Sequence, residues 1–486
     1  MRVLVLNPPV PPGSLTNRDL MGGMGINDDF GTSVSSRFVA FLKNQGTRMP
    51  VVSLGYAAAL LEGRADVSVL DLGDRPPDDA TLEQVLATRP DWIISATSFA
   101  YLGMELKFLQ RVHERCGAKR LLVGATATFF AREILEGGLG EVIASGDPEV
   151  AVKALAEGTL APGLAGCWML RDGKVSDTPK PGSVTDLDSL PLPDWSKFPR
   201  EQYRYFPLLR KRRFLPLLSS RGCPYACNFC PYPIAQGAPF RGRSPASVVT
   251  ELRNLVEGYG VESVLFRDPT FSMDLDRARG IARAVIEAGL KLEWGIETRL
   301  DRLDTELIEL LGKAGCASVE FGVDPLDDQT LLANHRRALA PGKVSDVVKA
   351  LEANGMRTAG LAVLGLPEQT EDEMLRTMDW VEELGLSYVN YELATPFPGT
   401  PLYEEALGKG WAQPIRFEAL LEGDPKLTFN GRVDQDAMRR LQDTALRRFY
   451  VRPQRVLREA LDGSLVESAK FFTQSGLRFL GRLGRA

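Results

Sequence analysis

Three cysteines stand within eight positions of one another, in the stretch "SSRGCPYACNFCPYP" at 219–233. Cys223, Cys227 and Cys230 have the spacing C-x3-C-x2-C, and no fourth metal ligand stands beside them. A structural zinc site is normally closed by four ligands. Three thiolates suit instead a four-iron, four-sulfur cluster in which one iron keeps an open position for a small-molecule ligand. The alternative is a zinc site completed by Cys316 or by one of the two histidines.

Six apolar runs between 213 and 400 alternate with helical patterns, and the cysteines follow directly on the first run. The runs are "FLPLLSS", "ESVLFRD", "KLEWGIET", "ASVEFGV", "RTAGLAVLG" and "YVNYELA". Six strand–helix units predict a full or partial β/α barrel of the TIM type, whose active site lies at the carboxyl ends of the strands. The three cysteines are therefore expected on the loop after the first barrel strand.

Residues 1–158 alternate in the same way. Apolar runs such as "RVLVLNPP" and "DWIISATSFA" are separated by helical stretches such as "VVSLGYAAALLEG", which is typical of a doubly wound parallel sheet. At 159–212 a Pro- and Gly-rich stretch follows, in which Asp172-Gly173 predicts a hairpin turn. We therefore predict an α/β protein with a Rossmann-like domain, a linker with a hairpin, the barrel domain at 213–400 and a mainly helical region at 401–486.

The composition is that of an ordinary soluble chain. A length of 486 residues allows two or three domains, and a net charge of -5 argues against a protein that coats nucleic acid. The first residues, "MRVLVLNPPV", lack the features of a signal peptide, and no apolar run approaches the roughly 20 residues that span a bilayer. We expect a cytoplasmic monomer that does not bind nucleic acid.

The stretch "RGCPYACNFCPYP" resembles the radical S-adenosylmethionine motif C-x3-C-x-aromatic-C, with Phe229 at the aromatic position. Other segments, including "VLFRDPTF", "GIETRLDRLD", "GLAVLGLPEQTEDE", "LNPP" and "SGDPE", are similar to the cobalamin-binding (class B) members of that family, so the resemblance covers nearly the whole chain. It implies three cofactors: a 4Fe-4S cluster on Cys223, Cys227 and Cys230, S-adenosylmethionine on the open iron, and cobalamin in the first domain. It also implies an external electron donor of the flavodoxin or ferredoxin type.

The resemblance assigns polar residues of the barrel to S-adenosylmethionine. Asp268 to Thr270 would meet its amino group, and Arg299 would pair with its carboxylate through a fork of donors. Asp324, where relatives more often carry glutamate, would accept hydrogen bonds from the ribose hydroxyls. The alternative for these charged residues is a structural salt bridge at the barrel rim.

Turns and strand ends are assigned to the cofactors on the same basis. Gly365 and the turn "PFPGT", with Pro398, would let the backbone approach the adenine, and the alternative is plain turn chemistry. Small and hydroxyl residues at the carboxyl edge of the first sheet would leave room for the corrin of cobalamin, and the alternative is loop residues with helix-capping hydroxyls. This second set consists of Asn7, Pro8, Ser95, Thr97, Ser98, Gly124, Thr126, Thr128, Ser145 and Gly146.

No D-x-H-x-x-G motif is present, so we predict cobalamin without a protein histidine on cobalt and interpret His113 as a surface residue. The glycine-rich segment "MGGMGINDDFG" at 21–31 is either a mobile lid near the cofactors or an irregular insertion. The tail from about 469 mixes arginines with Phe and Leu. It predicts either peripheral contact with an anionic membrane or a helix packed on the barrel.

The implied activity is methylation of an unreactive carbon in a small-molecule or lipid-like substrate. One S-adenosylmethionine would methylate cobalamin, and a second would give a 5'-deoxyadenosyl radical that removes hydrogen from the substrate before methylcobalamin donates its methyl group. Two alternatives remain at this point. One is oxidation, cyclisation or ring rearrangement with the same cofactors, and the other is a non-catalytic iron–sulfur or cobalamin-binding regulator.

Overall fold

The first domain is built on a six-stranded sheet in the order β5-β1-β6-β7-β8-β9. Its strands are β1 (Arg2–Asn7), β5 (Asp66–Asp71), β6 (Trp92–Ala96), β7 (Lys119–Val123), β8 (Val142–Ala144) and β9 (Cys167–Trp168). The first five pair in parallel, and most of their apolar residues are buried, on both faces of the sheet. The computed structural model describes residues 1–11, 14, 16–18, 26–27, 46–175, 180–422 and 433–450 of the chain.

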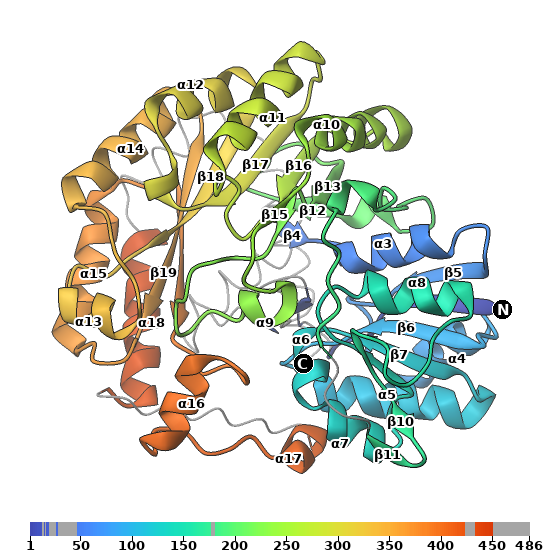
Figure 1. Cartoon of the computed structure of the whole chain (residues 1–486). Coiled ribbons are helices and arrows are strands. Elements are labelled where there is room, and N and C mark those ends of the chain that lie inside the picture. Colours follow the sequence, from blue (N-terminus) through green and yellow to red (C-terminus); the bar gives the residue numbers. More distant parts are fainter. Residues whose placement is uncertain are drawn as a thin grey trace, which may run out of the picture.

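Helices cover both faces of this sheet (Figure 1). On one face lie α3 (Val52–Leu61) and α8 (Glu149–Glu157), which pack against each other, and on the other lie α4 (Asp79–Leu86) and α5 (Leu102–Cys116). The predicted doubly wound sheet is confirmed. Its carboxyl edge, where β1, β6, β7 and β8 end, faces the barrel domain.

The second domain is a partial barrel of six parallel strands in sequence order. The strands are β13 (Phe214–Leu217), β16 (Ser263–Phe266), β17 (Glu293–Thr298), β18 (Cys316–Val323), β19 (Arg357–Leu364) and β20 (Tyr388–Leu393). All six lie within the predicted runs or overlap them. The helices α10 (Pro245–Arg253), α11 (Leu275–Glu287), α12 (Thr305–Lys313), α14 (Pro341–Ala353) and α15 (Glu371–Glu383) form the outer layer (Figure 1).

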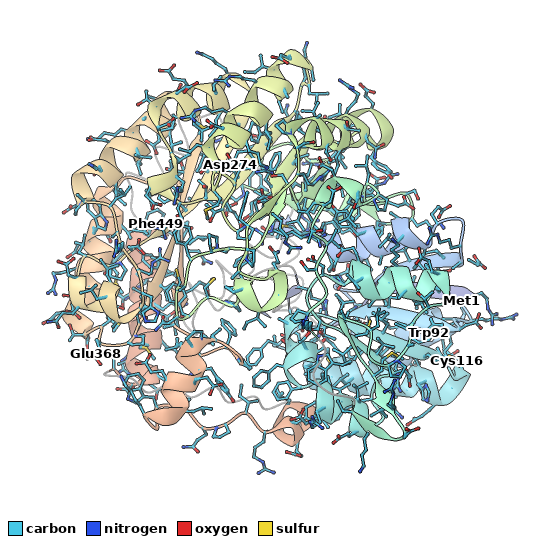
Figure 2. The ribbon with its side chains drawn as sticks, viewed as in Figure 1. Met1, Trp92, Cys116, Asp274, Glu368 and Phe449 are labelled. Atoms are coloured by element: carbon cyan, nitrogen blue, oxygen red, sulfur yellow. The ribbon has the colours of Figure 1, made fainter. Side chains whose placement is uncertain are left out.

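Local sequence signals explain where these helices begin. Thr370 and Glu373 form a capping box at the start of α15, and the carboxylates of Asp274 and Asp304 accept backbone hydrogen bonds at the starts of α11 and α12. The core between strands and helices is filled by side chains throughout the barrel (Figure 2).

Helices prevail after the barrel strands, as predicted. They are α16 (Pro401–Gly408), α17 (Phe417–Glu422) and α18 (Gln435–Tyr450). α18 packs on the last barrel strand, where Gln442 Nε2 donates to the carbonyl oxygen of Tyr391 at 2.7 Å. No helix in the described residues is long and apolar enough to cross a membrane. Most of the glycine-rich segment at 21–31 and the whole tail from 451 lie outside the described residues.

The linker takes part in both domains. The predicted hairpin is confirmed: β10 (Leu170–Arg171) pairs antiparallel with β11 (Lys174–Val175), and Asp172 and Gly173 both have positive φ. Two further pairings were not foreseen. β9 adds an antiparallel strand to β8, and β12 (Arg204–Tyr205) pairs with β4 (Thr47–Arg48) of the first domain.

Candidate active site

The cysteine loop leaves the barrel after β13 and is closed by a short antiparallel ribbon. β14 (Ser220–Arg221) pairs with β15 (Arg241–Gly242), and the three cysteines and α9 (Tyr232–Gln236) lie between them. Gly222 has a φ of +81°, and a Cβ there would lie 2.0 Å from the carbonyl oxygen of Pro239. Only glycine fits, so the residue before the first cysteine sets the course of the loop.

The three thiols lie close enough to influence one another's ionisation. Burial raises the pKa of Cys230 to about 12, and the neighbouring Cys227 and Cys223 add to the rise. Burial also raises the pKa of Cys223, while the backbone N–H of Tyr225 and the charge of Arg299 lower it. Burial thus favours the protonated form of Cys223 and Cys230, and metal binding must release the protons of these two thiols.

The zinc alternative finds little support in this arrangement. Cys316 is buried at the start of β18, at the opposite end of the sheet from the cysteine loop. His335 lies beside the loop, but its Nδ1 is 3.2 Å from the carbonyl oxygen of Ala226. Across the described residues, no three Cys, His, Asp or Glu side chains converge as the ligands of one metal ion do. In an iron–sulfur cluster each cysteine binds a different iron, and the three neighbouring cysteines of one loop are compatible with that arrangement.

Asp268 is the buried anchor of the cysteine loop. Its Oδ1 accepts from the backbone N–H of Ser219 at 2.7 Å, and its Oδ2 accepts from Ser220 Oγ at 2.7 Å. Thr270 is also buried, and its hydroxyl lies close enough to Cys223 to lower the pKa of that thiol. The assignment of both residues to S-adenosylmethionine stays a prediction, because the Asp268 carboxylate serves the loop and Thr270 Oγ1 donates to the carbonyl oxygen of Pro269 at 2.8 Å.

Arg299 stands over the ring of Tyr225, the second residue after Cys223, at 4.3 Å from the ring centroid. It forms an ion pair with Asp301 at 2.8 Å. Its charge acts on the thiol of Cys223. The guanidinium therefore lies beside the cysteines, although the salt bridge at the rim, the alternative for this residue, is also present.

Arg336 was missed by the sequence reasoning and lies at the centre of the site. It pairs with Asp324, its Nη1 donates to Cys227 Sγ at 3.2 Å, and its guanidinium is 5.7 Å from the ring centroid of Phe229. Burial opposes its charge, but Asp324 and Cys227 outweigh that cost and raise the pKa of Arg336. The cation of Arg336 thus lies between Asp324, which is predicted to bind the ribose hydroxyls, and Cys227, which is predicted to bind the cluster.

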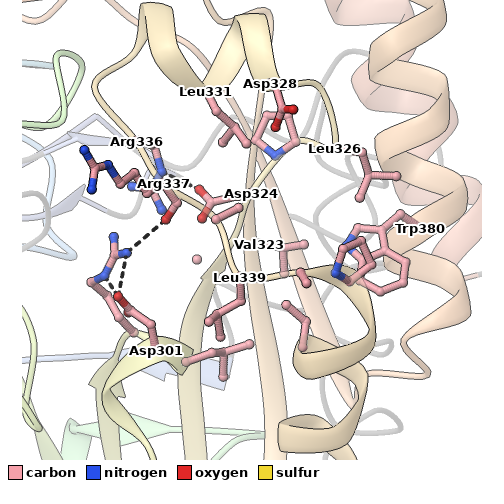
Figure 3. A pocket seen from close by; sticks show the side chains of 18 of the residues that line it. Asp301, Val323, Asp324, Leu326, Asp328, Leu331, Arg336, Arg337, Leu339 and Trp380 are labelled. Carbon is pink, nitrogen blue, oxygen red and sulfur yellow. Dashed lines mark hydrogen bonds and ion pairs between the residues drawn. The ribbon is translucent and has the colours of Figure 1, made fainter.

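A cavity of about 420 Å³ opens beside this ion pair (Figure 3). Arg299, Asp324 and Arg336 line its polar side, and the apolar side is formed by residues that include Leu339 and Trp380 (Figure 3). Three guanidinium groups (Arg299, Arg336 and Arg337) and three carboxylates (Asp301, Asp324 and Asp328) thus line the cavity next to the cysteine loop. This donor set suits a ligand that carries a carboxylate and hydroxyl groups.

The two predicted backbone contacts have structural explanations. Gly365 has a φ of +75°, a backbone conformation that favours glycine, and it lies against Met438 Sδ of α18. Pro398 is buried in the turn before α16, next to Phe397. The ring of Phe397 meets Phe99 of the first domain at 5.6 Å between centroids. The turn therefore belongs to the contact between the domains, and its role toward adenine stays a prediction.

The polar residues at the carboxyl edge of the first sheet are gathered as predicted, but several are occupied. Asn7 accepts from Arg18 at 2.7 Å, and Ser98 donates to Glu105 at 2.6 Å. Arg18 and Glu105 form a buried ion pair at 2.6 Å. Asn7 and Ser98 therefore belong to one internal network with this pair.

The remaining hydroxyls of this edge mostly serve the backbone. Thr97 Oγ1 donates to Val123 and Ser95 Oγ to Ala96, at 3.0 and 3.1 Å. Pro8, Thr126 and Ser145 are buried. The half-exposed members are Gly124, Thr128 and Gly146. A large ligand at this edge would therefore meet mainly small residues and backbone.

A buried ionic network connects this edge to the cysteine loop, and the sequence reasoning did not find it. Arg221, two residues before Cys223, donates to Asp147 at 3.0 Å and to both oxygens of Glu149 at 2.7 and 2.8 Å. Arg241 pairs with Asp147 as well. The two carboxylates follow β8, so the strand edge of one domain and the cysteines of the other are held as one unit.

Comparison with known proteins agrees with this geometry. Residues 217–381 match the family model of the radical SAM superfamily. An uncharacterised methyltransferase of Pyrococcus horikoshii is 25% identical over 430 residues, which cover 86% of this chain and 91% of that protein. An anaerobic magnesium-protoporphyrin IX monomethyl ester cyclase of Cereibacter sphaeroides is 28% identical over 71% of this chain and 58% of its own length.

Among solved structures, the radical S-adenosylmethionine methyltransferase TsrM of Kitasatospora setae, with cobalamin and a [4Fe-4S] cluster bound, has a TM-score of 0.66. The match covers 84% of this chain and 78% of TsrM at 19% sequence identity. At that identity the likeness concerns the fold, and it extends over both domains.

Proposed function

We propose that this chain, which belongs to the radical S-adenosylmethionine superfamily, is a cobalamin-dependent methyltransferase that methylates an unactivated carbon of a small molecule. The observation that carries the proposal is the buried network of Arg221, Asp147 and Glu149. It holds three neighbouring thiols against the ligand edge of a Rossmann-like sheet, so two cofactors can serve one substrate between them.

Cys223, Cys227 and Cys230 would hold the 4Fe-4S cluster. When bound, the cluster and S-adenosylmethionine supply a carbon radical that removes hydrogen from the substrate, and cobalamin supplies the methyl group. Asp268 fixes the start of the cysteine loop through its hydrogen bonds to Ser219 and Ser220. The protein would therefore contribute three thiolates on a loop whose start is anchored by Asp268.

Asp324, Arg299 and Arg336 would bind S-adenosylmethionine in the cavity beside the loop. The two guanidinium groups offer charged donors to its carboxylate, and Asp324 can accept from its ribose hydroxyls. Arg336 is the stronger candidate for the carboxylate, since it already contacts Cys227 Sγ.

Cobalamin would lie on the carboxyl edge of the first sheet. Gly124, Thr128 and Gly146 are its accessible small residues, and their size lets a flat ligand approach the backbone. Phe99 and Phe397 belong to a buried apolar cluster that joins the two domains beside this edge.

The test uses S-adenosylmethionine with a deuterated methyl group and needs no knowledge of the substrate. The anaerobically reconstituted protein should retain cobalamin and the cluster, and under reducing conditions it should transfer the label to cobalamin, read by mass spectrometry of the extracted cofactor. It should also release 5'-deoxyadenosine. Bound cofactors with neither product would instead indicate a non-catalytic protein.

A second candidate function is cyclisation or oxidation with the same cofactors, which the similarity to the Cereibacter sphaeroides cyclase favours. The same experiment separates the two. Release of 5'-deoxyadenosine without transfer of the label would support the second candidate.

A further inference from the structure

An exposed patch borders the cysteine loop on the side away from the first domain. We call it the cysteine-loop patch; it consists of Pro224, Ala226, Arg302, Leu332, His335 and Arg337. All are exposed except Arg302, which is half-buried. Leu332, with 71% of its surface exposed, is the most exposed large apolar residue in the part of the chain that the structure describes.

Contacts make the patch continuous with the loop. His335 Nδ1 lies 3.2 Å from the carbonyl oxygen of Ala226, between the first two cysteines. Arg302 Nε donates to the hydroxyl of Tyr225 at 2.8 Å. Arg299 Nη2 donates to the carbonyl oxygen of Arg337 at 3.4 Å. The patch is therefore one surface that ends on the residues between Cys223 and Cys227.

The charge of the patch is positive, whereas the whole chain has a net charge of -5. The neighbouring Arg299 and Arg336 are neutralised by Asp301 and Asp324. Within the described residues, Arg302 and Arg337 form no ion pair with an acidic side chain. Two uncompensated cations and an exposed leucine thus lie over the loop that would hold the cluster.

Other approaches to the cysteine loop are covered by the protein itself. Arg221 ties its first part to Asp147 and Glu149 of the first domain. Beyond the third cysteine, Ile234 packs in an apolar cluster with Phe99 and Phe397. The cysteine-loop patch is thus an open side from which a macromolecule can reach the loop.

We propose that the cysteine-loop patch is the docking surface for a small acidic one-electron carrier protein. The inference rests on the proposed function, because only a bound cluster needs this electron. The carrier loses one electron and the cluster gains one, with no atom transferred. Opposite charge speeds such encounters, and electron-transfer interfaces are small, so a few cations beside a short path to the cluster suffice.

The experiment compares two reductants of the cluster-loaded holoenzyme in stopped flow. The probe is reduced flavodoxin, and dithionite is the small reductant that needs no docking surface. We expect Arg302→Glu/Arg337→Glu to slow reduction of the cluster by flavodoxin about tenfold at low ionic strength, with the difference shrinking as salt screens the charges. Reduction by dithionite should keep its wild-type rate.

The matched control is Arg171→Glu/Lys174→Glu, which changes the net charge equally. These two exposed residues lie on the β10–β11 hairpin beside the first domain, away from the barrel (Figure 1). The control should retain the wild-type rate with flavodoxin. Arg337→Glu alone should show a smaller effect in the same direction and leaves the contact between Arg302 and Tyr225 intact.

A wild-type flavodoxin rate in the double patch variant would overturn the docking surface alone, as would equal slowing in the control. An equal loss of rate with dithionite would also overturn it, since the variant would then act on the cluster and not on docking. A wild-type protein that cannot be loaded with a cluster would overturn the proposed function and, with it, this inference.

Discussion

Replacing Arg221 with methionine should weaken the protein far more than loss of an ordinary salt bridge. Its side chain is 6% exposed, and Asp147 and Glu149, its partners, are each 2% exposed. The replacement leaves Glu149 buried without the cation that it faces. Breaking a buried pair in this way costs about 3–5 kcal/mol, because the remaining charge has lost its water and its partner.

The control is Arg64→Met, which breaks the pair of Arg64 with Glu157. That pair has a similar N–O distance, 3.0 Å, but its side chains are 46% and 38% exposed. Exposed pairs contribute about 0–1 kcal/mol. The two variants thus differ mainly in burial, and we expect the free energy of unfolding to fall by several kcal/mol only for Arg221→Met.

The assay is urea unfolding of the cofactor-free protein, followed by circular dichroism and tryptophan fluorescence, so that ligand binding does not contribute. Arg221→Met/Glu149→Leu should recover part of the loss, since an apolar pair of similar volume can replace a buried ion pair. If Arg221→Met were no less stable than Arg64→Met, the network would not hold the domains together and the reasoning would be refuted.

The other predictions concern the cofactors and the tail. Alanine at any one of the three loop cysteines should abolish iron absorbance and release of 5'-deoxyadenosine. Cys116→Ala, at the far edge of the first domain (Figure 2), should retain both. Cleavage of S-adenosylmethionine by all three single variants of the loop would contradict the assignment. His113→Ala should leave the spectrum of bound cobalamin unchanged, since Nδ1 faces the carbonyl oxygen of Ala118 at 2.9 Å; a changed spectrum would place this histidine on cobalt. Asp324→Ala should weaken S-adenosylmethionine binding about tenfold in calorimetry, because charged hydrogen bonds are lost. Asp328→Ala, in the same cavity, should leave the affinity unchanged. Equal effects of the two variants would argue against a specific contact of Asp324 with the ligand. Deleting the tail from Ala469 should abolish sedimentation with anionic liposomes if the tail contacts membrane, and reduced soluble yield would support packing on the barrel instead.

The strands and the cysteine loop could be predicted because their signals are local. Each barrel strand is a short apolar run, since a parallel strand is covered on both faces. Cys223, Cys227 and Cys230 share one loop, so their proximity follows from spacing. The hairpin at Asp172 and Gly173 follows from two residues that tolerate positive φ.

The charged contacts depend on distant parts of the chain and could not be predicted. Arg336 meets Cys227 across 109 residues, and this contact depends on where α13 (Asp328–Ala333) ends. Arg221 meets Asp147 across 74 residues because two sheets face each other. Asp268 was assigned to a cofactor, yet two serines before the loop satisfy its oxygens. A single sequence carries no signal for such pairings.

The strand β9 changes how the chain can be divided. Cys167 and Trp168 pair with Ala144 and Ile143 of β8, and Gly166 accepts from Ser145 N–H at 2.9 Å, so the linker occupies what would otherwise be the outer edge of the first sheet. A fragment that stops at 158 keeps the helices of that domain and the pairing of β8 with β7, but it leaves the backbone donors and acceptors on the other side of β8 unpaired. Such a bare strand recruits other chains. We therefore expect the isolated first domain to aggregate, because it lacks the two residues of β9 that cover this edge.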